Sequence, residues 1–435
     1  MEPITVIGAG LAGCEAAWQI AKRGGEVILY EMKPKVFSPA HRSPLFAELV
    51  CSNSFKSESF ENASGILKEE MKQLDSLILR IAKEAKVPAG DSLAVDREVF
   101  SKQITQALES LENVEVIREE VSFIPQDGMA IIATGPLTSE TLSNEIQKMT
   151  GTRHLFFYDA ISPIVTAESI DFQRAFKSSR YGKGGEDYVN CPMDEKGYTE
   201  FVEALNQAEK VSVQSFEKRY LFEGCLPIEE MAGRGRGTLA YGPLKPVGLV
   251  DPKTGKQPFA VVQLRQEDRF ETLFNLVGFQ TRLKYGEQER VFRMIPGLEK
   301  AEFVRLGSVH RNTFIDSPRL LKESLQLKTR ANLFFAGQIT GVEGYMESTA
   351  MGLLSGINAH RYANGMEVLT PPPMTAMGAL VHYITHSQAV PFQPMNVNFG
   401  LFPPLLGKSR GRGKRLLLAE RALKEMGAWT KRSEG

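Results

Sequence analysis

Cysteine is scarce in this chain: there are four copies, and no two of them form a CxxC pair. The absence of that spacing argues against a structural zinc site, so we expect no metal ion. The sequence also lacks an apolar run long enough to cross a bilayer and lacks a signal-like apolar segment behind a basic start. We therefore expect neither a membrane protein nor a secreted one, but a cytoplasmic protein whose thiols stay reduced.

The chain also lacks a charge excess, because 52 Lys and Arg balance 52 Asp and Glu. Overall charge therefore does not indicate a nucleic-acid partner, which would need a local basic patch. Residues 408–435 form one such patch, with nine Lys or Arg against three Glu. From charge alone, a solvated helical tail is the simpler interpretation. The length of 435 residues allows two or three domains, or one large discontinuous domain.

Glycine is concentrated near the start of the chain, in a strand–turn–helix pattern. The apolar, β-branched stretch ITVI (4–7) precedes GAGLAG (8–13). A helical stretch then runs to about Lys22, and EVILYE (26–31) reads as a second strand. In this context G-x-G-x-x-G is the fingerprint of a dinucleotide-binding βαβ unit.

Each position of this fingerprint has a physical role. Gly8 permits the tight turn, Gly10 lets the backbone approach a pyrophosphate, and Gly13 lets the helix pack closely on the strand. Glu31 ends the second strand, where a carboxylate accepts hydrogen bonds from ribose hydroxyls. The expected dinucleotide contacts here are Gly8, Ala9, Gly10, Leu11, Ala12, Gly13 and Glu31.

A second glycine-rich unit favours FAD over NAD. MAIIATGPLT (129–138) reads as a buried strand ending at Thr134 and Gly135, and residues 331–359 read as a strand, a turn and a long helix. Five glycines lie between positions 337 and 356, where they let the backbone approach a large flat ligand. A late unit of this kind is typical of α/β FAD-binding oxidoreductases. The expected contacts are Thr134, Gly135, Gly337, Gln338, Gly341, Glu343, Gly344 and Tyr345.

The middle of the chain differs in composition from the two glycine-rich units. It consists of turn-rich, charged and aromatic segments and contains no second fingerprint. We expect residues 1–190 and 305–435 to form a discontinuous FAD-binding domain, and residues 191–304 to form an inserted α+β domain over the flavin. Apolar residues at helical spacing predict a core-facing helix over 64–86. The stretch 391–405 is expected to be an ordered, extended wrap.

Two of the four cysteines stand in polar surroundings. Cys51 lies in FAELVCSNSFKS and Cys225 lies in YLFEGCLPIEEMAGRGRG. A disulfide oxidoreductase usually carries a close pair, whereas these two are 174 residues apart. Two interpretations of Cys51 and Cys225 therefore stay open: each thiol is either a packing residue or a nucleophile. Cys14 on the first helix and Cys191, before a proline in an expected turn, are predicted to be packing residues.

Several stretches, spread over nearly the whole chain, resemble one family: the folate- and FAD-dependent tRNA uracil-5-methyltransferases (TrmFO). They are VIGAGLAGCEAAWQIAKRG, PAHRSPLFAELVCSNSFKSE, LAVDREVF, EGCLPIEEMAGRG, YGPLKPVGL, FAGQITGVEGYMES and QPMNVNFGLFPPL. The two cysteine-bearing blocks are the most specific of these. The larger flavoprotein GidA/MnmG shares the FAD units, so the resemblance implies a GidA/glutathione-reductase-type fold. Cys14 stands where the family commonly has serine, and residues after Leu406 match only in their basic character.

The resemblance implies a reaction with 5,10-methylenetetrahydrofolate, FAD and NAD(P)H. A thiolate adds to C6 of uracil, which makes C5 nucleophilic toward the folate methylene carbon. Loss of the C5 proton and hydride reduction then give a methyl group and free the thiolate. We expect Cys225 to add to C6 and Cys51 to assist, and the reverse assignment stays open. Lys56, Arg234 and Arg236 are candidates for activating a thiol, because nearby cations lower a thiol pKa.

The resemblance also implies binding sites for folate and tRNA. His310 is the candidate for stacking on the pterin and Arg282 for binding its glutamate tail, while Glu343 and Tyr345 are candidates for orienting either cofactor. The expected target is the T-loop uridine at position 54 of tRNA, which must be extruded from its loop. The candidate phosphate contacts are Arg234, Arg236, Lys245, Lys408, Arg410, Arg412, Lys414 and Arg415.

Three other functions stay open at this point. A ribosomal RNA uridine is an alternative target for the same chemistry. A flavin-dependent NAD(P)H oxidoreductase acting on a small molecule, with structural cysteines, is another. The third is an RNA-binding protein that holds FAD without turnover. No obligatory protein partner is implied.

Overall fold

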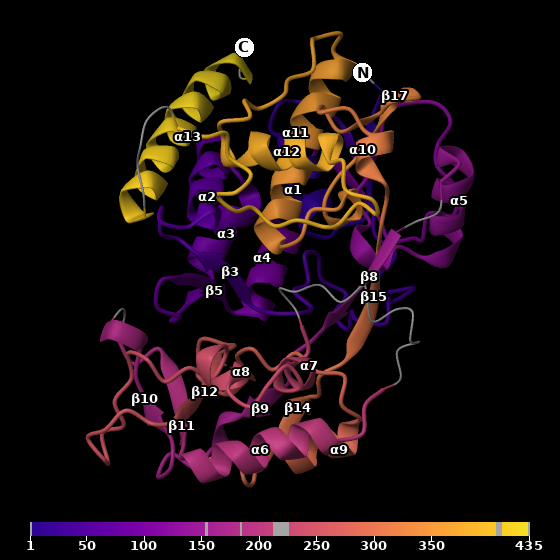
Figure 1. Ribbon diagram of the computed structural model, residues 1–435. Helices are drawn as coiled ribbons and strands as arrows, with labels where there is room; N and C mark the ends of the chain where they lie inside the picture. Colours follow the sequence, from indigo (N-terminus) through magenta and orange to yellow (C-terminus); the bar gives the residue numbers. More distant parts are fainter. Residues whose placement is uncertain (1, 153–154, 183–184, 212–225, 406–410, 434–435) are drawn as a thin grey trace.

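The computed structural model describes residues 2–433 except 153–154, 183–184, 212–225 and 406–410. The chain forms two lobes (Figure 1). We call the upper one, which contains both termini, the nucleotide lobe, and the lower one the insertion lobe. Each lobe has its own large hydrophobic core.

A six-stranded sheet in the order β16-β17-β7-β1-β2-β6 forms the centre of the nucleotide lobe. All neighbours pair in parallel except the antiparallel edge pair β16 and β17. Because β17 comes late in the chain but pairs with β7, the late glycine-rich unit lies beside the first one. The strands are β1 (Ile4–Ile7), β2 (Val27–Tyr30), β6 (Val114–Ile117), β7 (Ala130–Ile132), β16 (Gln326–Leu327) and β17 (Arg330–Phe335).

Two helices of this lobe pack unusually closely, α1 (Leu11–Ala21) against α11 (Tyr345–Ala363). A Cβ on Gly352 would lie 2.1 Å from the Ala12 carbonyl oxygen, and one on Gly356 would lie 2.6 Å from that of Ala16. Only glycine therefore fits at these two positions of α11. The other longer helices of the lobe are α2 (Ala63–Gln73), α3 (Leu77–Glu84), α4 (Arg97–Glu109), α5 (Glu140–Thr150), α12 (Ala376–His386) and α13 (Gly411–Ser433).

The single helix expected over residues 64–86 is two helices, α2 and α3. The chain turns between them at Asp75, whose φ is 55°, and Ser76 caps α3 by accepting a hydrogen bond from the Leu79 N–H. The buried Glu15 carboxylate fixes this corner by accepting from the Ser76 hydroxyl at 2.7 Å and the Ile78 N–H at 3.1 Å. Both helices still bury the expected apolar stripe. The apolar spacing therefore predicted the core-facing side correctly but did not predict the break at Asp75.

An antiparallel sheet in the order β10-β11-β12-β13-β9-β14 forms the insertion lobe, with the helices α6 (Glu195–Gln207), α7 (Ile228–Ala232), α8 (Thr238–Tyr241) and α9 (Tyr285–Phe292). This sheet already includes β9, so the lobe begins well before the expected residue 191. Cys191 lies in β11 rather than in a turn, where it pairs with Val262. The strands are β9 (Ile164–Thr166), β10 (Phe176–Lys177), β11 (Tyr188–Met193), β12 (Ala260–Gln266), β13 (Leu273–Leu276) and β14 (Phe303–Arg305).

A two-stranded antiparallel ribbon connects the lobes, with β8 (Leu155–Ala160) leading out and β15 (Val309–Phe314) leading back (Figure 1). A small sheet of β3 (Ser54–Ser57), β5 (Ser92–Val95) and β4 (Lys86–Val87) lies on the side of the nucleotide lobe that faces the insertion lobe. The Cys51 segment leads directly into β3 and therefore lies at the junction of the lobes. Across the described ranges, no helix is both long enough and apolar enough to cross a membrane.

Candidate active site

The predicted nucleotide loop has the geometry that its glycines require. Gly8 has φ +100°, and a Cβ there would lie 2.8 Å from the Ala133 carbonyl oxygen. A Cβ on Gly13 would lie 1.7 Å from the carbonyl oxygen of Gly8, so both positions are fixed by internal packing. Gly10, in contrast, has no atom within 4 Å of its Cβ position. The loop therefore presents open space beside Gly10, where a pyrophosphate would approach.

The same loop ends at an anion-binding feature. No side chain caps the N-terminus of α1, so its first N–H groups remain available to a phosphate. Glu31, at the end of β2, is buried and accepts hydrogen bonds from the Ala9 N–H at 3.1 Å and the Lys33 N–H at 3.0 Å. Its carboxylate thus lies at one end of the loop, where the ribose of a dinucleotide would sit.

A groove runs from Glu31 past the nucleotide loop to the late unit. Its lining joins residues of the first and late units, as expected for FAD. Ala9, Gly13, Gly341, Glu343 and Gly344 do not line it. The predicted contacts that do are Gly8, Gly10, Leu11, Ala12, Glu31, Thr134, Gly135, Gly337, Gln338 and Tyr345.

The late unit follows β17 as a turn built on left-handed glycines. Gly337 and Gly341 have φ angles of 82° and 84°. A Cβ on Gly341 would lie 2.4 Å from the Phe392 ring, so the 391–405 segment packs directly on this turn. The Gln338 side-chain amide donates to the Glu343 carboxylate at 2.6 Å, which holds the turn in shape at the end of the groove.

Tyr345 connects the groove to Cys51. Its ring lines the groove, and its hydroxyl accepts hydrogen bonds from the Cys51 N–H at 2.9 Å and the Ser52 N–H at 3.1 Å. Burial raises the pKa of the Tyr345 hydroxyl, and the neighbouring Cys51 raises it further. Cys51 is half-buried, and its Sγ lies 3.8 Å from the Ala160 carbonyl oxygen of β8. The thiol is therefore held between the late unit and the connecting ribbon.

Three arginines that sequence reasoning missed interact electrostatically with Cys51. Arg265, on β12, donates to the Asn53 side-chain oxygen at 2.7 Å and to the Ser52 hydroxyl at 2.8 Å. Burial lowers the pKa of Arg265 and of Arg305, and Cys51 is among the groups that act in the opposite direction. Such guanidinium groups compensate an anion formed near Sγ. No local sequence pattern indicates this contact, because Arg265 is more than 200 residues from Cys51 in the chain.

Arg97, the third of these arginines, joins the lobes. It is the first residue of α4, inside the stretch LAVDREVF. Its guanidinium donates to the Glu267 carboxylate of the insertion lobe and to the Leu49 carbonyl oxygen, each at 2.5 Å. Burial opposes the charge on Arg97, but Glu267 more than offsets this and the pKa is raised. The Cys51 segment is thus fastened to both lobes.

The cations expected beside the cysteines lie elsewhere or beside undescribed residues. The Lys56 ammonium lies 3.1 Å from the buried Glu347 carboxylate. Cys225, the second predicted catalytic thiol, lies outside the described residues. Arg234 and Arg236 follow α7 in the insertion lobe, where Arg236 donates to the Thr199 hydroxyl at 2.9 Å.

Cys14 and Cys191 are fully buried, and their burial raises the pKa of each thiol, that of Cys191 to about 12. Cys14 donates to the Ala9 carbonyl oxygen at 3.2 Å. A buried neutral thiol of this kind packs like a small apolar side chain and is a poor nucleophile. Both residues therefore have the packing environment expected for them.

His310 lies on β15 and is not among the residues that line the groove. Its Nε2 is 2.9 Å from the Ser308 hydroxyl, and burial together with the charge of Arg305 lowers its pKa. His41, which lines the groove, has a pKa of about 4, lowered by burial, by Lys33 and also by His310. Two imidazoles with lowered pKa values therefore lie close enough to interact electrostatically, and one of them, His41, lines the groove.

Arg282, the candidate for the folate tail, is buried in the insertion lobe and does not line the groove. Its side chain forms ion pairs with Glu230 and, at 3.9 Å, with Glu229. Burial raises the pKa of Glu229, and its hydrogen bond to the Arg282 N–H acts against that rise. These two carboxylates already neutralise the guanidinium, so a folate tail would have to compete with them.

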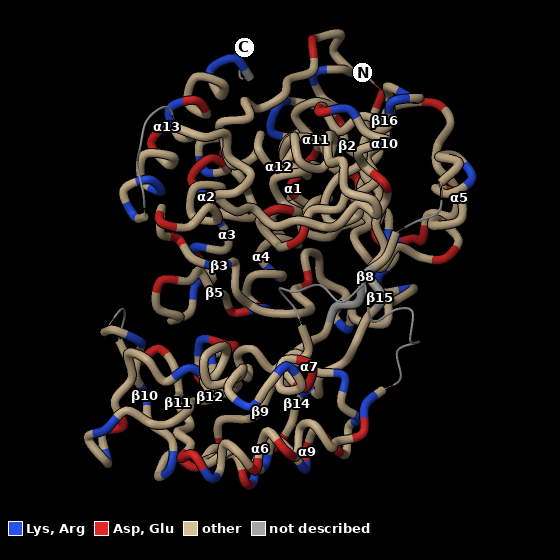
Figure 2. The backbone as a smooth tube through the Cα atoms, in the orientation of Figure 1, with Lys and Arg blue, Asp and Glu red and all other residues tan. Residues whose placement is uncertain are grey.

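The basic tail forms α13, which packs on α2 through Leu418, Ala422 and Met426. Its first two turns are exposed and carry the predicted tRNA contacts Arg412, Lys414 and Arg415 (Figure 2). Arg412 lies 2.6 Å from Glu61, and the Arg415 guanidinium lies 5.9 Å from the centre of the Phe399 ring. The predicted contacts Lys408 and Arg410 lie outside the described residues.

Comparison with known proteins identifies relatives of this fold. Residues 3–367 match the family described as glucose inhibited division protein A, GIDA. A crystal structure of Aquifex aeolicus GidA (form II) superposes with a TM-score of 0.72 at 16% identity, covering 99% of this chain and 73% of that chain. The form I crystal gives 0.70 at 18% identity, covering 99% and 78%. The expected GidA-type α/β fold is confirmed.

The curated relatives are much more similar in sequence. A protein of Geotalea uraniireducens named methylenetetrahydrofolate–tRNA-(uracil-5-)-methyltransferase TrmFO is 60% identical over 429 residues, 98% of each chain. Proteins of the same name from Geobacter sulfurreducens and Desulforamulus reducens are 59% and 58% identical, over 98% and 99% of this chain and 98% of each relative. This chain therefore belongs to the TrmFO family, within the wider GIDA family.

Proposed function

We propose that this protein methylates C5 of a uracil in tRNA, using the methylene carbon of 5,10-methylenetetrahydrofolate, with FAD as cofactor and NAD(P)H as reductant. The observation that carries the proposal is the double hydrogen bond from the Cys51 and Ser52 N–H groups to Tyr345. These bonds link the Cys51 segment to a residue that lines the dinucleotide groove, which supports a site where a thiol and a redox cofactor act on one substrate. The nearly full-length similarity to the TrmFO relatives supports the same reaction.

The residues that would hold FAD are those of the groove. Glu31 would accept from the ribose hydroxyls, and the N-terminus of α1 beside Gly10 would bind the pyrophosphate. Gly337, Gln338 and Tyr345 of the late unit would hold the flavin end of the cofactor. When bound, the flavin supplies the hydride that turns the transferred one-carbon unit into a methyl group.

The cysteines would activate the uracil. A thiolate forms a bond to C6, and the electrons of the C5–C6 double bond move onto O4 as an enolate. C5 then attacks the methylene carbon of the folate, whose bond to N10 breaks. A base removes the C5 proton as the bond to N5 breaks, which releases tetrahydrofolate and leaves a methylene group on C5. Hydride then adds to that methylene carbon, and the thiolate leaves C6. We assign the attack to Cys225 and assistance to Cys51. Arg97, Arg265 and Arg305 would compensate the negative charge that forms on the ring or on Sγ.

The folate and tRNA contacts are assigned by their position. His310, which interacts electrostatically with His41 of the groove lining, would stack on the pterin, and Arg282 remains the candidate for the glutamate tail. The exposed start of α13 and Arg234 and Arg236 would bind phosphates of the T arm, so that the uridine at position 54 is extruded toward the groove.

An isotope experiment tests this function. The flavin-loaded protein is incubated with NADPH, an unmodified tRNA transcript and methylenetetrahydrofolate carrying a labelled methylene carbon. We expect the label in 5-methyluridine of the T loop, and none from labelled S-adenosylmethionine. Label in ribosomal RNA but not in tRNA would favour the alternative target. No label in either RNA, from protein whose flavin NADPH reduces, would contradict the proposal and favour a small-molecule oxidoreductase.

Single and double replacement of the cysteines separates their roles. We expect Cys225→Ser to abolish C6 addition, which a 5-fluorouracil-substituted tRNA would report as loss of the covalent protein–RNA adduct. Cys51→Ser should retain the adduct and lose methylation by about a hundredfold or more. Loss of the adduct in Cys51→Ser alone would reverse the assignment, and full methylation by both single variants would exclude a cysteine nucleophile.

A further inference from the structure

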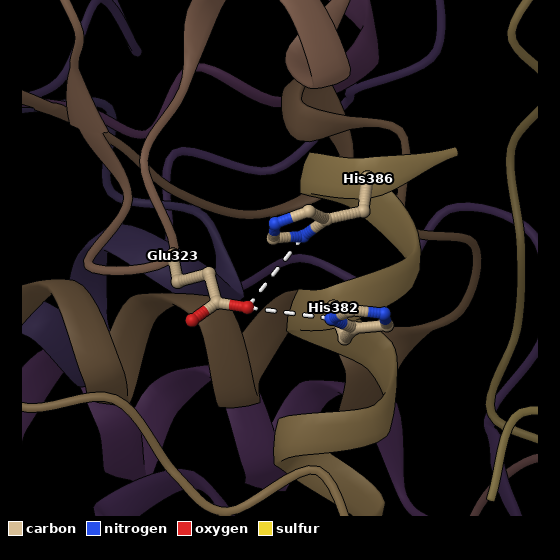
Figure 3. A group of neighbouring side chains, drawn as sticks. All are labelled: Glu323, His382 and His386. Atoms are coloured by element: carbon tan, nitrogen blue, oxygen red, sulfur yellow. Dashed lines mark hydrogen bonds and ion pairs between the residues drawn. The ribbon is translucent and has the colours of Figure 1, made fainter. Parts of the chain in front are cut away.

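A group of three side chains with metal-ligating chemistry lies outside the groove. His382 and His386 are one helical turn apart on α12, and both project toward Glu323, which lies in the turn between α10 (Ser317–Leu320) and β16 (Figure 3). One ligand atom from each residue lies within 4.8 Å of the other two. The cysteine spacing that argued against a zinc site does not bear on these imidazoles.

The spacing of the ligand atoms is compatible with a bound metal ion. The Nδ1 atoms of His382 and His386 lie 3.3 and 3.5 Å from the same carboxylate oxygen of Glu323. The His382 contact is a long hydrogen bond, and both distances are longer than the usual N–H···O range of about 2.7–3.2 Å. Tetrahedral ligands at about 2.0–2.2 Å from a zinc ion stand about 3.3–3.5 Å from one another. Two of the three edges of a tetrahedral face therefore already have the required length.

The elements that carry the ligands are fixed independently of any ion. At the start of α12, the buried Glu70 carboxylate accepts from the Ala376 and Met377 N–H groups at 2.6 and 2.8 Å. The Glu323 turn is closed by a hydrogen bond from the Leu325 N–H to the Lys322 carbonyl oxygen at 2.9 Å. Ligands on rigid elements lose little conformational freedom on binding, which favours a preformed site.

We propose that Glu323, His382 and His386 bind one divalent transition-metal ion, with zinc as the reference ion. Two imidazoles and one carboxylate are a ligand set of zinc sites that leave a fourth position to water. The imidazole rings are stacked, with centroids 4.4 Å apart and planes 19° apart, and both Nδ1 atoms face the same oxygen of Glu323. The Thr385 hydroxyl lies 3.0 Å from the His386 Nδ1, and this hydrogen bond would have to break when Nδ1 binds the ion. The bound ion would clamp the end of α12 to the turn before β16.

Cobalt(II) and zinc are the probes for this site, used on the untagged, flavin-loaded protein. Cobalt bound by imidazole and carboxylate shows visible d–d absorption without the intense near-ultraviolet band of thiolate ligation, which separates this site from the free cysteines. We expect one such cobalt ion per chain, displaced by zinc. His382→Gln, His386→Gln and Glu323→Gln should each weaken binding about tenfold or more. Lys322→Gln, beside the ligand but not one of them, should leave it unchanged.

Thermal unfolding gives a second readout that does not depend on the spectrum. Zinc should raise the Tm of the wild type and of Lys322→Gln, because an ion that binds only the folded state stabilises it by mass action. The double variant His382→Gln/His386→Gln, compared at its own metal-free Tm, should show no rise. Absence of stoichiometric cobalt binding, or equal affinity in the wild type and both histidine variants, would overturn the proposal.

Discussion

At the scale of single residues, the Tyr345 hydroxyl connects the Cys51 segment to the groove by two hydrogen bonds. Tyr345→Phe keeps the aromatic ring and removes the acceptor of two partly buried N–H groups, each of which costs up to about 1–3 kcal/mol when left unpaired. We expect flavin content to be retained while methylation falls by about tenfold to a hundredfold, because the Cys51 segment loses its position.

Absorbance of bound flavin and single-turnover methylation measure the two effects of Tyr345→Phe. Tyr383→Phe is the matched control, since it removes a hydroxyl that donates to the Gln393 carbonyl oxygen away from Cys51. Full methylation activity in Tyr345→Phe would show that the two hydrogen bonds do not position the thiol.

Arg265 is a second positioning residue at this scale. Arg265→Lys keeps the positive charge but cannot reproduce the fork that binds Ser52 and Asn53. We expect methylation to fall about tenfold and iodoacetamide to alkylate Cys51 faster, because the segment is less well held while the local charge is unchanged. Peptide mass spectrometry follows the alkylation.

Arg180→Lys is the control for Arg265→Lys. Arg180 also binds by its fork, to Gln263 and to carbonyl oxygens of the same lobe, but does not contact the Cys51 segment. Equal effects of the two substitutions on the alkylation of Cys51 would attribute them to general loosening of the insertion lobe.

At the scale of elements, the contact between α1 and α11 holds the two halves of the groove together. Gly352→Val places side-chain atoms where the Ala12 backbone now lies, and overpacking of this kind costs about 1–3 kcal/mol or more. We expect loss of bound flavin and a lower free energy of unfolding. Gly286→Ala is the control in helix α9, where a Cβ meets nothing within 4 Å, and it should stabilise by about 0.5–1 kcal/mol.

Denaturant unfolding of the flavin-free protein and flavin content after purification check this pair. A Gly352→Val protein as stable and as fully loaded as the wild type would mean that α11 can shift away from α1 without opening the groove.

The first βαβ unit and the late unit could be predicted, because a short stretch of glycines and apolar residues indicates each of them. The groove between them followed from their chemistry. The arginines around Cys51 were not predictable, since Arg265 reaches Ser52 through the packing of two lobes and no local pattern records that contact. The break between α2 and α3 was also missed, because the apolar stripe continues across Asp75 and only its backbone conformation and the Ser76 cap end the first helix.

At the scale of the whole molecule, positive and negative side chains are mixed over both lobes, and the start of α13 is a local basic site (Figure 2). We expect the triple charge reversal Arg412→Glu, Lys414→Glu and Arg415→Glu to weaken tRNA binding. The slope of log K against log salt should flatten by about 0.7–0.9 for each phosphate that the variant no longer neutralises. Filter binding over a range of salt concentrations measures this slope.

A second triple variant provides the control for the tail: Lys148→Glu, Lys196→Glu and Lys300→Glu change the same net charge at exposed positions of α5, α6 and the segment before β14. It should leave the slope nearly unchanged. If the slope flattened equally in both variants, the effect of the tail would come from net charge and not from direct contact with tRNA.

The close packing of α11 on α1 also has a consequence for biosynthesis. The partner surface of the first βαβ unit comes from residues that the ribosome adds more than 300 positions later. Until β17 and α11 emerge, the nascent chain exposes one edge of a parallel sheet and the glycine-fitted face of α1. The insertion lobe, with its own core, is completed first. We therefore expect a nascent chain stalled before residue 330 to hold a complete insertion lobe beside an unfinished, aggregation-prone nucleotide lobe.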